Sequence, residues 1–178
     1  GKIYGLLGRN GAGKTTLFNC ISGEMDFDSG KIYMTDEENS ESMNYEKIGY
    51  VYSTPILPEF LTGYEFIRFF TDINKKKIKN IKIPEEYADM VCFDRSDLDK
   101  LIKGYSHGMK NKMQMLVNIM ADPAVLLLDE ITANLDAETE AHVLAALRRA
   151  SAGRTVLSVS HRVYEDLGGR TIEIRTRE

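Results

Sequence analysis

The chain has 178 residues, 43% hydrophobic and 28% charged, which is enough for one domain with a sizeable core. Its formal net charge of −4 argues against nucleic-acid binding as its main property. Cys20 and Cys92 are too few for a disulfide framework, and the longest apolar runs, such as residues 125–128, fall far short of the roughly 18 residues of a membrane span.

A glycine-rich loop follows the first predicted strand. Residues 2–7 form an apolar run of strand length, residues 8–16 read GRNGAGKTT, and apolar residues then recur at helical spacing as far as Ser22. The loop matches the phosphate-binding pattern GxxxxGK[S/T] at every fixed position, and its place between a strand and a helix is the context that this pattern requires. A glycine turn that merely joins a strand to a helix is the alternative interpretation.

The residue types of this loop suit a nucleoside triphosphate. Without a Cβ, Gly8, Gly11 and Gly13 allow backbone N–H groups to converge on the β-phosphate, and the positive end of the following helix adds to this anion site. The Lys14 ammonium would contact the β- and γ-phosphates, and the Thr15 hydroxyl would bind Mg²⁺.

The next hundred residues contain shorter elements. Residues 31–34 and 48–52 are predicted strands, and residues 35–47 between them are predicted to form a surface loop. Thr62 and Glu65 have the spacing of a capping box, so a helix should begin there. Further short helices are expected over residues 74–104. The lysine-rich run at 75–79 favours a solvated face, with an anionic lipid or a partner as the alternative.

The last part of the chain alternates helices with buried strands. A helix opens at residues 105–109, and its methionines indicate a core-facing stripe. Residues 125–128 have the apolar composition of a central parallel strand, which ends in Asp129 and Glu130. A helix over 137–150 and a strand over 155–159 follow, and His161 comes just after that strand.

This order predicts an α/β fold with a mainly parallel sheet flanked by helices, and a helical subdomain inserted between the strands at 48–52 and 125–128. We expect one domain over 1–178, with 1–60 and 121–178 as its core and 61–120 as the helical subdomain. Ligands of such sheets bind at the carboxyl ends of the strands, where the phosphate loop and His161 both fall.

Three polar residues at those strand ends are candidates for chemistry. Asp129 can reach the Mg²⁺ shell, and Glu130 is placed to orient or deprotonate a water beside the γ-phosphate. His161 is a candidate γ-phosphate contact. A surface acid in a turn and a polar loop residue are the alternatives for Glu130 and His161.

Five motifs in order resemble the ATP-binding-cassette ATPases, which are P-loop NTPases: GRNGAGKTT, YSHGM at 105–109, LLLDE at 126–130, NLD at 134–136 and SH at 160–161. The YSHGM sequence is more similar to bacterial exporter cassettes than to importer ones. The resemblance implies an ATP-hydrolysing subunit that works as a head-to-tail dimer and drives export of an unknown substrate.

The resemblance also implies a role for each matching residue. Glu130 would be the catalytic carboxylate and His161 the switch histidine. Mg²⁺ would be held by Thr15, Asp129 and Ser53. Nucleotide contacts would come from Gly8, Asn10, Gly11, Gly13, Lys14, Thr15 and Thr16, with Ser106, Gly108 and Asp136 completing the site of the other subunit.

The implied cofactors are ATP and Mg²⁺, and the implied partners are ATP or ADP, a second cassette and a membrane-spanning transporter subunit, with no nucleic acid. The helices at 61–104 would dock on the membrane partner. The domain would then be cytoplasmic, on the inner face of the cell membrane.

Two positions depart from the family pattern. Ser53 stands where family members usually carry a glutamine that senses Mg²⁺ and the membrane partner, and His107 fills a glycine position where its side chain would crowd the neighbouring γ-phosphate. These departures favour an alternative function, a nucleotide-binding cassette that hydrolyses weakly or not at all and acts as a regulatory or assembly module.

The chain ends and the composition suggest two further hypotheses. Gly1 is not a start methionine and the first strand begins almost at once, so we expect a chain trimmed at both ends. Residues 1–134 contain 13 lysines and 9 asparagines, whereas 135–178 contain neither residue but have 7 arginines. This break suggests a fusion of two cassettes near Leu135, with chance variation in composition as the alternative.

Overall fold

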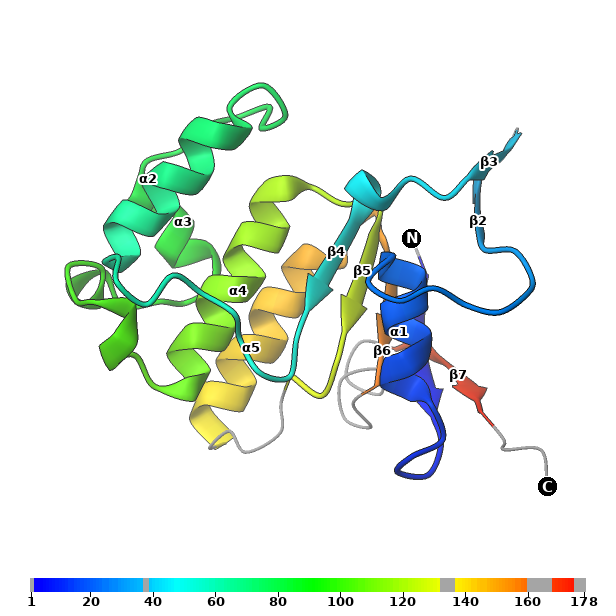
Figure 1. Ribbon diagram of the computed structural model, residues 1–178. Coiled ribbons are helices and arrows are strands. Elements are labelled where there is room, and N and C mark those ends of the chain that lie inside the picture. Colours follow the sequence, from blue (N-terminus) through cyan, green and yellow to red (C-terminus); the bar gives the residue numbers. More distant parts are fainter. Residues whose placement is uncertain (1, 37–38, 132–136, 160–167, 175–178) are drawn as a thin grey trace.

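A parallel β-sheet forms the centre of the molecule in the computed structural model, which describes residues 2–36, 39–131, 137–159 and 168–174. Its five strands are β1 (Ile3–Leu7), β4 (Ile48–Val51), β5 (Val125–Leu128), β6 (Thr155–Ser158) and β7 (Arg170–Glu173). They lie in the order β4-β5-β6-β1-β7, and every neighbouring pair is parallel (Figure 1). The predicted α/β fold with a mainly parallel sheet is therefore confirmed.

The register brings the functional segments to one edge of this sheet. Val51 pairs with Leu128, and Leu128 pairs with Ser158. Because the strands are parallel, the segments that follow β1, β4 and β5 all leave the sheet at the same edge. The residues of β5 from Leu126 to Leu128 are buried, as predicted for a central strand.

Helices cover both faces of the sheet (Figure 1). On one face α1 (Lys14–Ser22) packs through Phe18 against Tyr50 and Leu127. On the other face α4 (His107–Ala121) and α5 (Ala137–Ala150) share a larger core with the sheet. The methionine stripe of α4 belongs to this core, because Met113 and Met120 are buried in it. The central strand β5 is therefore buried from both sides, with Leu127 in one core and Leu126 and Leu128 in the other.

The predicted helical insertion is present. It contains α2 (Gly63–Asn74), α3 (Pro84–Met90), α4 and two short 3₁₀ turns, Arg95–Asp97 and Ile102–Gly104. The capping box at the start of α2 is confirmed, because the Glu65 backbone N–H donates to the Thr62 hydroxyl at 3.1 Å and the Thr62 N–H donates to the Glu65 carboxylate at 2.8 Å. No helix among the described residues has the length and apolar composition needed to cross a membrane.

One expectation was wrong and one strand was not predicted. Residues 35–47 are not a plain loop, because β2 (Tyr33–Asp36) pairs antiparallel with β3 (Asn39–Ser42) and a 3₁₀ turn follows at Tyr45–Lys47. Backbone pairing in this hairpin outweighs its polar composition. The edge strand β7 was not predicted, since all four of its residues are exposed and it has no apolar run.

Candidate functional site

The phosphate loop connects β1 to α1 and depends on glycine at two positions. Gly11 and Gly13 have φ angles of 81° and 90°, in the left-handed region that side chains disfavour, and Gly13 caps the N-terminus of α1. A Cβ on either residue would meet no atom within 4 Å, so backbone conformation and not crowding requires glycine here. Gly8 is different, because a Cβ there would lie 3.2 Å from the Ile174 carbonyl oxygen.

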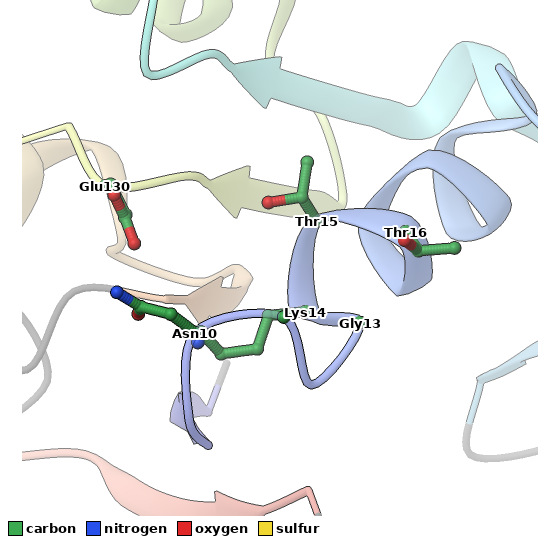
Figure 2. A pocket seen from close by; sticks show the side chains of 7 residues that line it. Asn10, Gly13, Lys14, Thr15, Thr16 and Glu130 are labelled. Carbon is green, nitrogen blue, oxygen red and sulfur yellow. The ribbon is translucent and has the colours of Figure 1, made fainter. Parts of the chain in front are cut away.

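This loop borders an open cavity of about 330 Å³. The residues that line it are Asn10, Gly11, Gly13, Lys14, Thr15, Thr16 and Glu130. Figure 2 shows the Glu130 side chain pointing from the end of β5 toward the loop. The structure thus brings together six predicted phosphate contacts and the predicted catalytic carboxylate. The N-terminal end of α1, whose first backbone N–H groups have no partner within the helix, also opens into the cavity.

The Lys14 ammonium is held by the loop itself. Its Nζ donates to the carbonyl oxygens of Gly8 at 2.8 Å and Arg9 at 3.0 Å. Both acceptors are neutral, so they leave most of the positive charge available to an anion in the cavity.

Thr15 and Asp129 meet where α1 passes the end of β5. The Thr15 hydroxyl lies 3.3 Å from both carboxylate oxygens of Asp129, which is only 5% exposed. Burial raises the pKa of Asp129 and the negative charge of Glu130 adds to this, whereas the hydrogen bond from Thr15 and the charge of Lys14 act in the opposite direction. A hydroxyl beside a buried carboxylate that lacks a full counter-charge is a donor set that suits Mg²⁺.

Glu130 follows Asp129 but faces a different environment. Its side chain is exposed and lines the cavity, and its backbone has a φ angle of 47°. This left-handed conformation is uncommon outside glycine, and it turns the chain at the strand end. One strand end therefore presents a buried carboxylate to Thr15 and an accessible one to the cavity.

The other predicted site residues that the structure describes do not line this cavity. Ser53 follows β4 and is not among the described residues that line the cavity. Ser106 caps α4 by accepting a hydrogen bond from the Met109 N–H at 3.2 Å, and Gly108 is buried in the first turn. Figure 1 shows this end of α4 well apart from α1. His161 and Asp136 lie outside the described residues.

Two residues of α4 that the motifs did not single out contact the segments that follow β5 and β4. Asn111 donates to the carbonyl oxygen of Ile131 at 3.1 Å, next to Glu130, and Gln114 bonds the backbone of Tyr52, next to Ser53. The only available signal was the presence of amides within an apolar helix, and such a pattern does not identify their partners.

Comparison with known proteins identifies a family to which the chain is similar. Residues 1–133 match the model of a protein family described as ABC transporter. An uncharacterized ABC transporter ATP-binding protein of Bacillus subtilis, YdbJ, is 34% identical over 100% of this chain and 59% of its own length. The ribose import ATP-binding protein RbsA of Caldanaerobacter subterraneus is 29% identical over 93% of this chain and 35% of its own length. Across the relatives compared, the chain spans between 17% and 59% of the relative's length.

Solved structures share the fold. A dimeric ATP-binding cassette, MJ0796, solved in a post-hydrolysis state bound to ADP and Pi, superposes with a TM-score of 0.78 at 20% identity. The match covers 98% of this chain and 81% of the other. The arrangement of sheet and helices is therefore that of the cassettes.

Proposed function

The chain belongs to the ABC transporter family and is an ATPase domain of the ATP-binding-cassette type, and from this premise we propose that it hydrolyses ATP to drive transport by a membrane-spanning partner. The observation that carries the proposal is the arrangement around one cavity, where Lys14 and Glu130 face the space beside the Thr15–Asp129 contact. This arrangement combines a cation for the phosphates, oxygen ligands for Mg²⁺ and a carboxylate for water.

Binding would begin with an exchange of partners at Lys14. Its ammonium leaves the carbonyl oxygens of Gly8 and Arg9 for the β- and γ-phosphates, while the free N–H groups at the start of α1 take further phosphate oxygens. The Thr15 hydroxyl and the Asp129 carboxylate would hold Mg²⁺, which when bound neutralises charge on the β- and γ-phosphates.

Hydrolysis would then proceed by in-line attack of water. Glu130 accepts a proton from the water while the oxygen of that water bonds to the γ-phosphorus. The bond between the γ-phosphorus and the bridging oxygen breaks at the same time, which gives ADP and inorganic phosphate. Lys14 and the loop N–H groups stabilise the negative charge on the transferred group. We assign His161 to a γ-phosphate contact and Ser53 to the Mg²⁺ shell.

The proposed working form is a head-to-tail dimer. Ser106 is exposed at the N-terminus of α4, a helix end that offers N–H groups to an anion but lies apart from the cavity of its own chain. In a second copy turned head to tail, Ser106, Gly108 and Asp136 would complete the partner's nucleotide site. His107, exposed in the same turn, would then lie beside that nucleotide.

The proposed membrane partner docks on the insertion, residues 61–120, which we propose as the helical subdomain, and on the loop before it. These segments carry several exposed apolar side chains, with Phe60 79% and Ile56 75% exposed. The others are Phe69, Ile73, Ile81, Ile83 and Leu101. An apolar surface of this kind indicates an interaction site. Such docking places the domain on the cytoplasmic face of the membrane. The YSHGM motif supports export of the substrate.

One substitution tests this function. Purified protein should bind Mg-ATP in calorimetry and release phosphate, and Glu130→Gln should keep ATP affinity within about threefold while phosphate release falls about 100-fold or more. The variant should also elute as a dimer with ATP. Glu85→Gln, which neutralises an acid of α3, is the matched control. Parental turnover in Glu130→Gln would show that another group activates the water.

A weakly hydrolysing regulatory cassette is the second candidate. Ser53 at the usual glutamine position, outside the residues that line the cavity, favours it. Tight Mg-ATP binding without phosphate release from the parent protein would select this alternative.

A further inference from the structure

Helix α4 carries three amide side chains that bond to the backbone of other segments. They belong to Asn111, Gln114 and Asn118. Asn111 is fully buried and Gln114 is 4% exposed, although most of the surrounding core is apolar. Buried amides are costly unless hydrogen-bonded, so their partners need an explanation.

Gln114 binds both backbone groups of Tyr52. Its Oε1 accepts from the Tyr52 N–H at 3.2 Å, and its Nε2 donates to the Tyr52 carbonyl oxygen at 3.0 Å. The adjacent Val51 carbonyl points the other way, toward the Asp129 N–H. The amide of Gln114 therefore takes the place of a neighbouring strand just where β4 ends and the segment with Ser53 begins.

Asn111 makes a similar contact with the segment that follows β5. Its Nδ2 donates to the carbonyl oxygen of Ile131 at 3.1 Å, one residue after Glu130. Its Oδ1 is buried and has no hydrogen-bond partner among the described residues. The unsatisfied oxygen has a cost that an apolar side chain of similar size would avoid, so stability alone does not account for an amide at this position.

The two contacts are separated by less than one helical turn. At the usual rise of an α-helix, Asn111 and Gln114 lie about 8 and 12 Å along the axis from Ser106. A displacement of the first turn of α4 therefore reaches the backbone next to Glu130 and next to Ser53 through one rigid element.

We propose that Asn111 and Gln114 are positioning residues that link the Ser106 end of α4 to the two segments beside the phosphate cavity. The inference rests on the proposed function, in which Ser106 contacts the nucleotide of the other subunit and Glu130 activates water. Closure of the dimer on that nucleotide would set the positions of Glu130 and Ser53 in the same chain. With serine at position 53, Gln114 supplies a connection between this segment and the insertion.

Asn118 provides the control, because it makes the same kind of contact within β4 and not with the segment that follows the strand. Its Nδ2 donates to the Tyr50 carbonyl oxygen at 3.3 Å and to the Gln114 carbonyl oxygen at 2.9 Å. Tyr50 lies within β4, two residues before Tyr52. A role limited to stability predicts similar effects for Asn118 and Gln114, whereas a positioning role predicts different ones.

The experiment compares Gln114→Met, Asn111→Leu and Asn118→Leu, each of which replaces an amide by an apolar side chain of similar size, in the full chain that contains these residues. Gln114→Met and Asn111→Leu should lower kcat for ATP about tenfold or more, with KM within about twofold because the phosphate loop is untouched. Asn118→Leu should keep kcat within about twofold. Amide hydrogen exchange should quicken at Tyr52 in Gln114→Met only.

Each outcome decides one question. Parental kcat in Gln114→Met, or equal losses in Gln114→Met and Asn118→Leu, would overturn the inference. Unchanged exchange at Tyr52 in Gln114→Met would do so as well, even if Asn111→Leu fails to fold. A parent protein that releases no phosphate contradicts the proposed function instead, and the exchange measurement then still shows whether Gln114 holds the Tyr52 segment.

Discussion

The hydroxyl of Thr15 lies 3.3 Å from each carboxylate oxygen of Asp129, across 114 residues of sequence. The contact fixes the first turn of α1 against the end of β5. Among the described residues, this hydroxyl and the charge of Lys14 are the groups that favour the ionised form of a largely buried carboxylate. The buried charge of Asp129 therefore destabilises the folded protein at the position where a metal ion is proposed to bind.

Removing the Asp129 charge should stabilise the nucleotide-free protein. Asp129→Asn keeps the size of the side chain, and we expect its midpoint of thermal unfolding to rise by about 2–4 °C, corresponding to about 1 kcal/mol. Mg-ATP turnover should be lost. Differential scanning calorimetry checks the first expectation, and Asp72→Asn, at an exposed position of α2, is the control. A lower midpoint for Asp129→Asn would mean that the carboxylate is well compensated.

The advantage of Asp129→Asn should also depend on pH. Because burial raises the pKa of Asp129 in the folded protein, the cost of its charge is complete above that raised pKa and absent below the ordinary aspartate pKa. The difference in stability between Asp129→Asn and the parent should therefore be largest near neutral pH and shrink as the pH falls through this window. Urea unfolding at several pH values measures it. A difference that grows toward acid pH contradicts the assignment.

Loss of the Lys14 charge should abolish tight nucleotide binding. Lys14→Met preserves the aliphatic stem but removes the ammonium that would contact the phosphates, so we expect the dissociation constant for Mg-ATP to rise about 100-fold or more. Isothermal titration calorimetry measures the change, with Lys31→Met at an exposed position as control. If Lys14→Met binds Mg-ATP like the parent, the phosphates do not lie in this cavity.

The backbone of the phosphate loop gives a separate prediction. Gly13→Ala would place a Cβ in open space at a φ angle of 90°, so it should cost about 1–2 kcal/mol through strain alone and weaken Mg-ATP binding. Gly104→Ala also meets open space, but without a positive φ angle, and should be neutral or slightly stabilising. Equal unfolding midpoints for these two variants would refute the argument from strain.

The capping box of α2 should affect stability without affecting the site. Thr62→Ala removes the acceptor for the Glu65 N–H and should cost about 1 kcal/mol, with Mg-ATP affinity unchanged. Hydrogen bonds from the Thr62 backbone and hydroxyl to the Glu65 carboxylate lower the pKa of Glu65. The stability that these bonds to the carboxylate contribute is present at neutral pH and is lost as the pH falls through the lowered pKa. Thermal unfolding at pH 7 and pH 3 should show a smaller loss at the lower pH.

Local patterns were enough to predict the centre of the site. The phosphate loop is specified by its own glycines and its flanking strand and helix, and Asp129 and Glu130 follow a strand whose burial is evident from its composition. Since parallel strands leave a sheet at a common edge, the meeting of Thr15 with Asp129 followed from the fold class.

The contacts of Gln114 and Asn111 were beyond such reasoning. Their partners lie 62 and 20 residues away, and an amide in a helix has no pattern that distinguishes a buried backbone contact from exposure to water. Strand β7 was missed because pairing with β1 creates it without burying its side chains. The roles of His161 and Asp136, and a fusion near Leu135, stay predictions.

The amides of α4 have one more consequence, for behaviour at high concentration. An outermost strand with free N–H and C=O groups can recruit an extended segment of another molecule, which is a common start of aggregation. In β4 and the residue after it, the Tyr50 carbonyl and both polar groups of Tyr52 are already taken by side chains of the same molecule. Gln114 and Asn118 therefore leave these backbone groups unavailable for pairing with a strand of another molecule at this edge of the sheet.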